Sequence, residues 1–355
     1  MVTRSSLKQR MSANKSFTIA VDGMGGDKAP QSIIDGIKDF YTETNNPNLK
    51  FLLFIPEKYK KLVKTIEDFT TVFCVEDIVN SEENPLRVLK KGLTTTMGQA
   101  IQAVADGKAD AVFSGGSTGA YIALCWKILG LLPSINKIAI PARIPCENGL
   151  NLILDVGASP VVTEKDLTQF AIMGHAMARI IFEKSYPKLG LLNIGTEEIK
   201  GLPQTIAAHK ILKTIKSLNY KGFIEPPQIF TKDIDVIICD GYAGNITLKS
   251  IKGSEIFFNK LLKGFLTRNF LSKVMSMGAL YHVKQLKKSL DWRQYNGAPL
   301  LGFSKLAMKS HGDSDAVATK AALQATYSFL QHNIIEQITE ELKHSEDLLV
   351  IESQS

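Results

Sequence analysis

Residues 17–40 read FTIAVDGMGGDKAPQSIIDGIKDF. A short apolar run of strand length comes first, a glycine-rich turn follows, and apolar residues then recur at helical spacing. This order recurs along the chain and is typical of βαβ units. We therefore predict a three-layer αβα fold around a largely parallel sheet. The expected strands are 17–21, 51–55, 111–113, 151–154, 189–192 and 236–239, and the expected helices are 31–40, 97–106, 120–129, 165–183 and 203–217.

The length and the composition limit the classes of protein to which this chain can belong. The chain has 355 residues, 45% of them hydrophobic, which is enough for a large core. Its apolar runs end well before the ~20 residues that a membrane-spanning helix needs. Because no linker divides the chain, we predict one α/β domain at 17–335, with a flexible tail at 1–16 (Met11 being an alternative start) and a C-terminal tail at 336–355. The four cysteines are widely spaced, and three of them lie in apolar or strand-like contexts that favour buried thiols in a reducing compartment, so we expect no disulfide, metal or cofactor.

The net charge of +7 favours acidic partners. No motif of a nucleic-acid-binding protein is present, so nucleic acid is not expected. Lysines and arginines alternate with large apolar residues over 256–290, which indicates a projecting amphipathic helical hairpin or an ordinary half-buried one. Contacts with a membrane or an acidic protein are expected from Lys284, Lys287 and Lys288.

Small polar turns follow five of the expected strands. They read DGMGGD at 22–27, SGGSTG at 114–119, DVGA at 155–158, NIGT at 193–196 and DGYAGN at 240–245. In a parallel sheet such turns lie along one edge, where open α/β sheets bind ligands and where helix N-termini attract anions. One such turn alone is more often a tight connection, but five together predict a phosphate site.

Known nucleotide signatures fit poorly. Lys28 occupies the place of the third glycine of the dinucleotide fingerprint, and no P-loop motif occurs. Residues 115–119 match the GxSxG nucleophile motif at Ser117, and Asp240 and His311 follow in the order of α/β-hydrolases. A serine thioesterase therefore remains an alternative at this stage.

Several motifs together resemble the bacterial phosphate acyltransferase family, which converts acyl-acyl carrier protein to acyl-phosphate. They are IAVDGMGGDKAP at 19–30, SGGSTGA at 114–120, LLNIGTE at 191–197, DGYAGNITLK at 240–249, YNGAPLLG at 295–302 and KSHGDSDA at 309–316. The family typically has Asn where this chain has Ser117, so the resemblance argues against a serine nucleophile.

The resemblance implies an activity and a setting. It implies transfer of a fatty acyl group from acyl carrier protein to inorganic phosphate for phospholipid synthesis, in a cytoplasmic homodimer that contacts the inner face of the anionic cell membrane and the downstream glycerol-3-phosphate acyltransferase. It also implies a fold like that of the isocitrate and isopropylmalate dehydrogenases and the phosphate acetyltransferases, with the hairpin at 254–290. An acetyltransferase-like enzyme using acyl-CoA, a hydroxyacid dehydrogenase and a non-catalytic membrane scaffold stay as alternatives.

The site residues follow from the turns and the resemblance together. His311 is the candidate proton donor or oxyanion partner because its pKa suits proton transfer near neutral pH. Lys249 and Asn245 complete the catalytic set. The residues expected to hold or shape the phosphate site are Asp22, Gly25, Gly26, Asp27, Ser114, Gly116, Ser117, Thr118, Gly119, Asn193, Gly195, Asp240, Gly241 and Gly244. The three aspartates fit a turn-forming role equally well, since an unpaired carboxylate repels phosphate.

Overall fold

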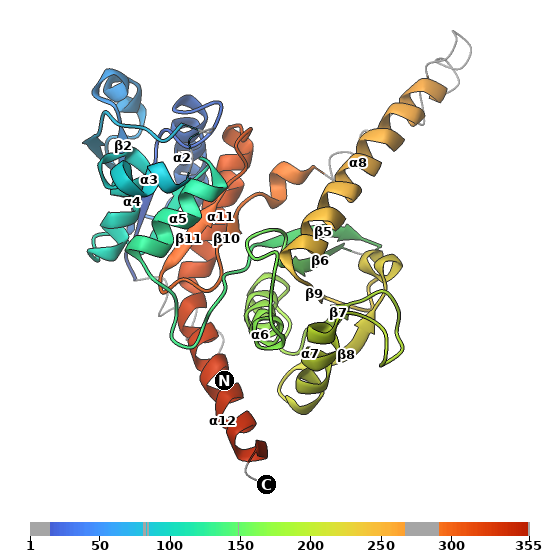
Figure 1. Ribbon diagram of the computed structural model, residues 1–355. Helices are drawn as coiled ribbons and strands as arrows, with labels where there is room; N and C mark the ends of the chain where they lie inside the picture. The colour runs from blue at the N-terminus through green and yellow to red at the C-terminus, as the bar shows by residue number, and fades with distance from the viewer. Residues whose placement is uncertain (1–14, 81–82, 84, 148, 267–290, 354–355) are drawn as a thin grey trace, which may run out of the picture. The chain divides into compact units, whose positions relative to one another are not determined.

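The computed structural model describes residues 15–353 except 81–82, 84, 148 and 267–290. The chain divides into two compact units (Figure 1). Unit 1 comprises Met1–Pro141, Ile172–Tyr186 and Arg293–Ser355, and unit 2 comprises Ala142–Ala171 and Pro187–Trp292. All the predicted strands and helices occur, and the prediction of a three-layer α/β protein with mostly parallel sheets is confirmed. A single domain at 17–335 stays a prediction.

The strands form two sheets instead of the one that we predicted. The sheet of unit 1 has the order β10-β11-β4-β1-β2-β3, and its β10–β11 pair is antiparallel while the other pairs are parallel. Its strands are β1 (Phe17–Asp22), β2 (Leu49–Ile55), β3 (Thr70–Cys74), β4 (Ala111–Ser114), β10 (Ala298–Pro299) and β11 (Leu306–Lys309). In the centre, Ile19, Ala20 and Val21 of β1 have 0% exposure, as expected for a parallel strand covered on both faces.

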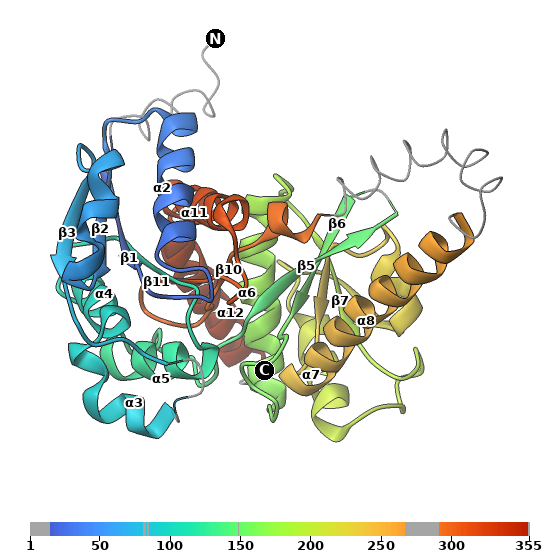
Figure 2. The same ribbon diagram turned by 90° about the horizontal axis from the view of Figure 1, so that it is seen from above.

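Helices cover both faces of this sheet. Figure 2 shows α2 (Gln31–Thr44) and α11 (Ala316–Gln331) side by side on one face, with α4 (Thr96–Ala105) and α5 (Thr118–Ile128) on the other. A Cβ on Gly36 of α2 would lie 2.5 Å from Thr319 Cγ2 of α11, so glycine lets the two helices approach closely. The remaining elements of this region are η1 (Glu57–Thr65), α3 (Pro85–Lys91), η2 (Gly92–Thr94) and η4 (Trp292–Tyr295).

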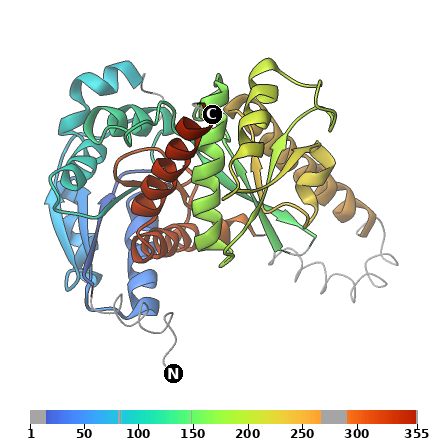
Figure 3. The ribbon, with the colours of Figure 1, turned by 90° about the horizontal axis from the view of Figure 1, so that it is seen from below.

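The C-terminal segment differs from the prediction of a tail from residue 336. It forms helix α12 (Ile334–Ser353), which lies beside α6 (Glu164–Ile181) in Figure 3. Glu341 of α12 binds two residues of α6: its Oε2 lies 2.8 Å from His175 Nδ1, and its Oε1 accepts from Arg179 at 2.7 Å. His175 is buried at this contact.

The sheet of unit 2 has the order β5-β6-β9-β7-β8, and the pairs of β6 with β9, β9 with β7, and β7 with β8 are parallel. Its strands are β5 (Pro141–Cys146), β6 (Gly149–Leu154), β7 (Lys188–Leu192), β8 (Asn219–Ile224) and β9 (Val236–Ile238). Helix α7 (Pro203–Thr214) packs on β8, α8 (Gly241–Leu266) packs on β6, and the short η3 (Pro226–Phe230) precedes β9.

Helix α8 continues past its contact with the sheet of unit 2 (Figure 1). Large apolar side chains on its outer half are exposed: Ile256 by 69%, Phe258 by 65% and Phe265 by 69%. Within the described residues, no helix combines the length and the apolar character that a membrane crossing requires. The predicted hairpin continues into 267–290, so its second half lies outside the described residues, as do Lys284, Lys287 and Lys288.

Candidate active site

Three polar side chains end neighbouring strands at the carboxyl edge of the unit 1 sheet. Ser114, the last residue of β4, pairs with Lys309, the last residue of β11. Asp22 ends β1 and directly follows Val21, which pairs with Phe113 of β4. Side chains at equivalent positions of neighbouring parallel strands point to the same face of the sheet. Asp22, Ser114 and Lys309 therefore form one group, which we call the strand-end cluster.

Ser114 ties the turns after β1 and β4 together. Its Oγ donates to Asp22 Oδ2 at 2.7 Å and accepts from the Gly116 N–H at 3.1 Å. Asp22 Oδ1 also accepts from the Met24 N–H at 3.2 Å. A serine hydroxyl has one proton to donate. In this geometry that proton goes to Asp22, so Ser114 organises the turns and does not present a donor to a ligand.

The cluster holds two buried ionisable side chains, one acidic and one basic. Asp22 is 2% exposed, and burial raises its pKa, although hydrogen bonds from Ser114 and Thr96 oppose the rise. Lys309 is 8% exposed, and burial lowers its pKa to about 8, although the charges of Asp22 and Asp27 oppose that fall. Buried ionisable groups with shifted pKa values are typical of functional sites.

Sequence reasoning missed Lys309 as a site residue. In the sequence Lys309 is only the first letter of the KSHGDSDA motif at 309–316. The strand before it, β11, has four residues and is too short to stand out by periodicity. A lysine directly before a glycine-bearing turn was the signal that could have revealed it.

Three turns pack backbone to backbone above the cluster. A Cβ on Gly25 would lie 2.8 Å from both the Gly115 and Gly116 nitrogens, and a Cβ on Gly115 would lie 2.5 Å from the Gly25 oxygen. Gly26 has φ +122° and a Cβ there would lie 3.0 Å from the Gly312 oxygen. Asp27 N–H donates to that same oxygen at 2.7 Å. Glycine is therefore required here by close contact and not only by turn geometry.

Helix α5 begins directly beside these turns. Ser117 precedes its first residue and makes no side-chain cap hydrogen bond. The first N–H groups of a helix lack partners within the helix and carry the positive end of its dipole. Thr118 and Gly119 in this first turn are exposed. The arrangement suits an anion.

His311 lies on the turn after β11 and is exposed. The position of this turn is fixed by Asn296, whose Oδ1 accepts from the His311 N–H at 3.3 Å and whose Nδ2 donates to Ser310 Oγ at 2.7 Å. Among the predicted residues, Asp22, Gly25, Gly26, Asp27, Ser114, Gly116, Ser117, Thr118, Gly119 and His311 all belong to unit 1.

The other predicted site residues belong to unit 2, so the prediction that all five turns line one sheet edge is wrong. The reason is that β6, β7 and β9 pair with one another and with no strand of unit 1. The predicted residues Asn193, Gly195, Asp240, Gly241, Gly244, Asn245 and Lys249 follow β7 or β9 at the carboxyl edge of this second sheet.

The turn after β6 is built around a buried carboxylate. Asp155 is 0% exposed, and its oxygens accept from the N–H groups of Gly157 at 3.1 Å, Ala158 at 3.1 Å and Ser159 at 2.6 Å. Asn245 of α8 donates to the Val156 oxygen at 3.1 Å. These bonds fix the start of α8 against the turn.

Two further predicted residues hold their own loops. Asn193 Nδ2 donates to the Gly195 oxygen at 3.1 Å and to the Lys200 oxygen at 2.8 Å. Asp240 Oδ1 accepts from the Ala243 N–H at 2.7 Å at the start of α8. Lys249 is exposed two turns into that helix.

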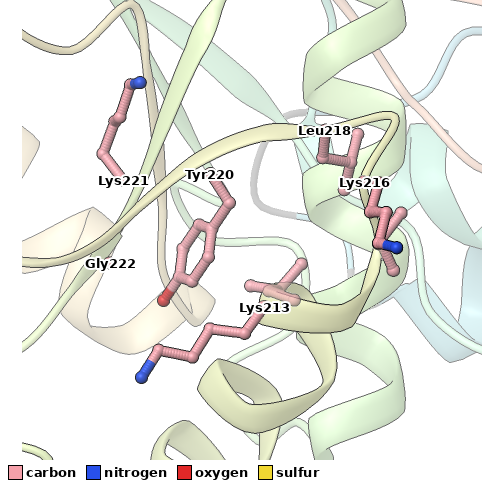
Figure 4. Close-up of a pocket in the computed structure, with 8 residues that line it drawn as sticks. Lys213, Lys216, Leu218, Tyr220, Lys221 and Gly222 are labelled. Carbon is pink, nitrogen blue, oxygen red and sulfur yellow. The ribbon is translucent and has the colours of Figure 1, made fainter.

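A hollow of about 230 Å³ lies elsewhere in unit 2 (Figure 4). It is lined by the end of α7 and the first half of β8, including Lys213, Lys216 and Tyr220. Lys213 already forms an ion pair with Glu198. Because the hollow adjoins the amino end of β8, it lies away from the turns at the carboxyl edge. Within the described part of the chain, no group of three or more His, Cys, Asp or Glu side chains could hold a metal ion.

Comparison with known proteins decides the family. The family model described as "Fatty acid synthesis protein" matches residues 17–337. A phosphate acyltransferase of Legionella pneumophila (strain Corby) is 35% identical over 334 residues, which cover 92% of this chain and 97% of the relative. The chain belongs to the phosphate acyltransferase family. A second relative, the phosphate acyltransferase of Clostridium perfringens (strain SM101 / Type A), is 34% identical over 91% of this chain and 96% of its own.

Membership in this family confirms the predicted enzyme class, an acyltransferase that uses phosphate as acceptor. Solved structures agree in fold. A phosphotransacetylase from Streptococcus pyogenes has TM-score 0.59 at 16% identity and covers 92% of this chain and 99% of its own. A branched-chain phosphotransacylase from Enterococcus faecalis V583 has TM-score 0.55 at 14% identity, over 88% and 99%. At such low identity the likeness concerns the fold alone.

Proposed function

We propose that this chain transfers a fatty acyl group from the thioester of acyl carrier protein to inorganic phosphate, and that the phosphate binds above the strand-end cluster of unit 1. The observation that carries the proposal is the joining of three glycine turns, backbone to backbone, beside the uncapped start of α5. Backbone N–H groups at such a place bind anions without neutralising them. Phosphate thereby keeps the charge that makes it a nucleophile.

The proposed reaction is a single displacement at the thioester carbonyl. A phosphate oxygen forms a bond to the carbonyl carbon, the carbon–sulfur bond breaks, and the departing thiolate takes up one proton, either directly from hydrogen phosphate or from a side chain that hydrogen phosphate then reprotonates. The products are acyl-phosphate and the free thiol of the carrier. The protein contributes position and preorganised donors, which can supply several kcal/mol of the rate enhancement. No covalent enzyme intermediate is required.

His311 is our proposed donor to the departing sulfur or the developing oxyanion, because it is exposed on the turn that touches the glycine assembly. The catalytic roles of Asn245 and Lys249, which lie on helix α8 of unit 2, stay predictions. Asn193 and Asp240 fix the loops that follow β7 and β9 in the same unit.

The test is direct. Purified protein is incubated with acyl-acyl carrier protein and phosphate, and acyl-phosphate is trapped with hydroxylamine as the hydroxamate. We expect product only when phosphate is present. Free fatty acid formed without phosphate would support the thioesterase alternative instead. A parallel reaction with acyl-CoA measures whether the enzyme behaves like a phosphate acetyltransferase in its choice of donor.

We also propose that the enzyme is a cytoplasmic homodimer that binds the anionic face of the membrane, where its product passes to the glycerol-3-phosphate acyltransferase. The exposed apolar side chains of α8 support the membrane contact, since lysines at 252, 260 and 263 accompany them. The second half of the hairpin and the dehydrogenase-like name of the fold stay predictions.

Liposome flotation tests the membrane contact. Charge reversal at Lys284, Lys287 and Lys288 is expected to weaken flotation with anionic vesicles. The matched control reverses three exposed lysines of η1 in unit 1, namely Lys58, Lys61 and Lys64. Equal flotation of both variants and the parent protein would argue against the contact.

A further inference from the structure

We propose that Lys309 is the cation that binds the inorganic phosphate in the strand-end cluster and that its charge sets the affinity of the enzyme for this substrate. The proposal rests on the proposed function and assigns a specific role to a residue that the motifs alone did not single out. Its support comes from the position, the burial and the hydrogen bonds of the lysine.

The position of Lys309 is fixed by strand pairing. It is paired with Ser114 at the end of β11, directly before the turn that carries His311 and Gly312. That turn touches the two other glycine turns: a Cβ on Gly115 would lie 3.4 Å from the His311 oxygen. Lys309 is therefore held beneath the three backbones that form the anion site.

The fold does not occupy all the N–H donors of the Lys309 ammonium. Among the residues that the structure describes, its one hydrogen-bond acceptor is the Ser310 carbonyl, and it forms no ion pair. A lysine ammonium has three N–H donors. Asp22, the buried carboxylate whose charge acts most strongly on Lys309, accepts from Ser114 and from the Met24 N–H. Donors of Lys309 are thus left for an oxygen-rich ligand.

The burial of Lys309 favours the binding of an anion next to it. A cation that is 8% exposed is costly unless it is paired, and its pKa of about 8 reflects that cost. The groups that act on it are Asp22 on β1 and Asp27 on the following turn. Burial, with a smaller contribution from the charge of Asp22, raises the pKa of Tyr121 of α5 well above its usual value. Tyr121 therefore stays neutral. Bound phosphate would supply the missing negative charge.

The test compares three variants of the full chain in steady-state assays. Lys309→Gln is expected to raise the KM for phosphate by about 10- to 100-fold, the loss typical of a hydrogen bond to a charged group, while the KM for the acyl donor changes little. Lys309→Arg is expected to keep most of the phosphate affinity. Lys305→Gln removes an exposed lysine from the same segment and serves as the matched control without effect.

The pH dependence separates binding from a structural role. Above about pH 8 the KM for phosphate of the parent enzyme should rise, approaching about tenfold per pH unit as Lys309 loses its proton. Lys309→Arg should abolish this rise, because an arginine keeps its charge over this pH range. A phosphate KM that is unchanged in Lys309→Gln, or an equal rise in the KM for both substrates, would overturn the proposal. A parent enzyme that makes no acyl-phosphate at all would instead overturn the proposed function.

Discussion

Replacing Lys309 by methionine should make the empty protein more stable. The lysine has an ordinary pKa of 10.5 and a folded-state pKa of about 8, and this difference corresponds to about 3 kcal/mol of unfavourable free energy for the buried charge at neutral pH. Methionine has a similar length and no charge. We therefore expect Lys309→Met to raise the free energy of unfolding by up to about 3 kcal/mol while phosphate binding is lost.

The pH dependence of this gain has a definite sign. Between about pH 8 and pH 10.5 the unfolded state binds more protons at this lysine than the folded state, so the parent protein gains stability as the pH rises. The advantage of Lys309→Met is therefore complete below about pH 8 and disappears above 10.5.

Urea unfolding in phosphate-free buffer at several pH values measures the effect, with the slope of the transition showing that the same surface is exposed in both proteins. Adding phosphate should then stabilise the parent protein by mass action and leave Lys309→Met unchanged. A variant that is less stable than its parent at neutral pH, or a difference that does not shrink at alkaline pH, would show that the lysine serves the fold and refute the reasoning.

Two further substitutions test the turns. Gly25→Ala forces a methyl group against the Gly115 and Gly116 nitrogens, so it should lower the free energy of unfolding by about 1–3 kcal/mol and abolish most of the phosphate affinity. The control Gly253→Ala places its methyl group in open space on helix α8 and should be neutral or stabilising by up to about 1 kcal/mol. Thermal unfolding of the two variants measures the contrast. Ser117→Ala should retain turnover within about fivefold, because one neutral hydrogen bond contributes only about 1 kcal/mol. Lost turnover together with lost labelling of an acyl-serine in Ser117→Ala would instead establish the hydrolase mechanism.

Apolar periodicity and turn residues were sufficient to predict the strands that end in glycine-rich turns. The run 17–21 is long enough to be recognised alone, and the short run 111–113 is recognised by the glycine-rich turn and the helix that follow it. The tight packing of Gly25 on Gly115 could not be predicted, because it depends on which strands become neighbours. Strand pairing depends on the whole chain, so the sequence of a single strand does not show which strand it pairs with.

The assignment of turns to sheets failed for the same reason. β6, β7 and β9 have the same apolar character as β1 and β4, so periodicity could not tell that they form a second sheet. Likewise, the role of Ser114 as a tie between turns depends on Asp22, which is 92 residues away in sequence. Charges that act across such separations, as Asp22 acts on Lys309, appear only once the strands are paired.

Asp22 should control the pH at which Lys309 binds phosphate. Its charge is the largest influence that raises the pKa of Lys309, ahead of Asp27, while burial lowers it. Asp22→Asn keeps the size of the side chain and removes the charge, so the pKa of Lys309 should fall below about 8. We expect the alkaline rise in the phosphate KM to move down by about one pH unit, the lower end of the range for a neighbouring charge.

Asp27→Asn is the matched control, because its carboxylate is exposed and acts on Lys309 more weakly. It should shift the same profile by less. Circular dichroism of both variants at neutral pH confirms that the turns are folded before the KM is measured. If the larger shift belonged to Asp27, or if neither carboxylate moved the profile, the group that titrates could not be the buried lysine, because the charge of Asp22 acts on that lysine more strongly than the charge of Asp27.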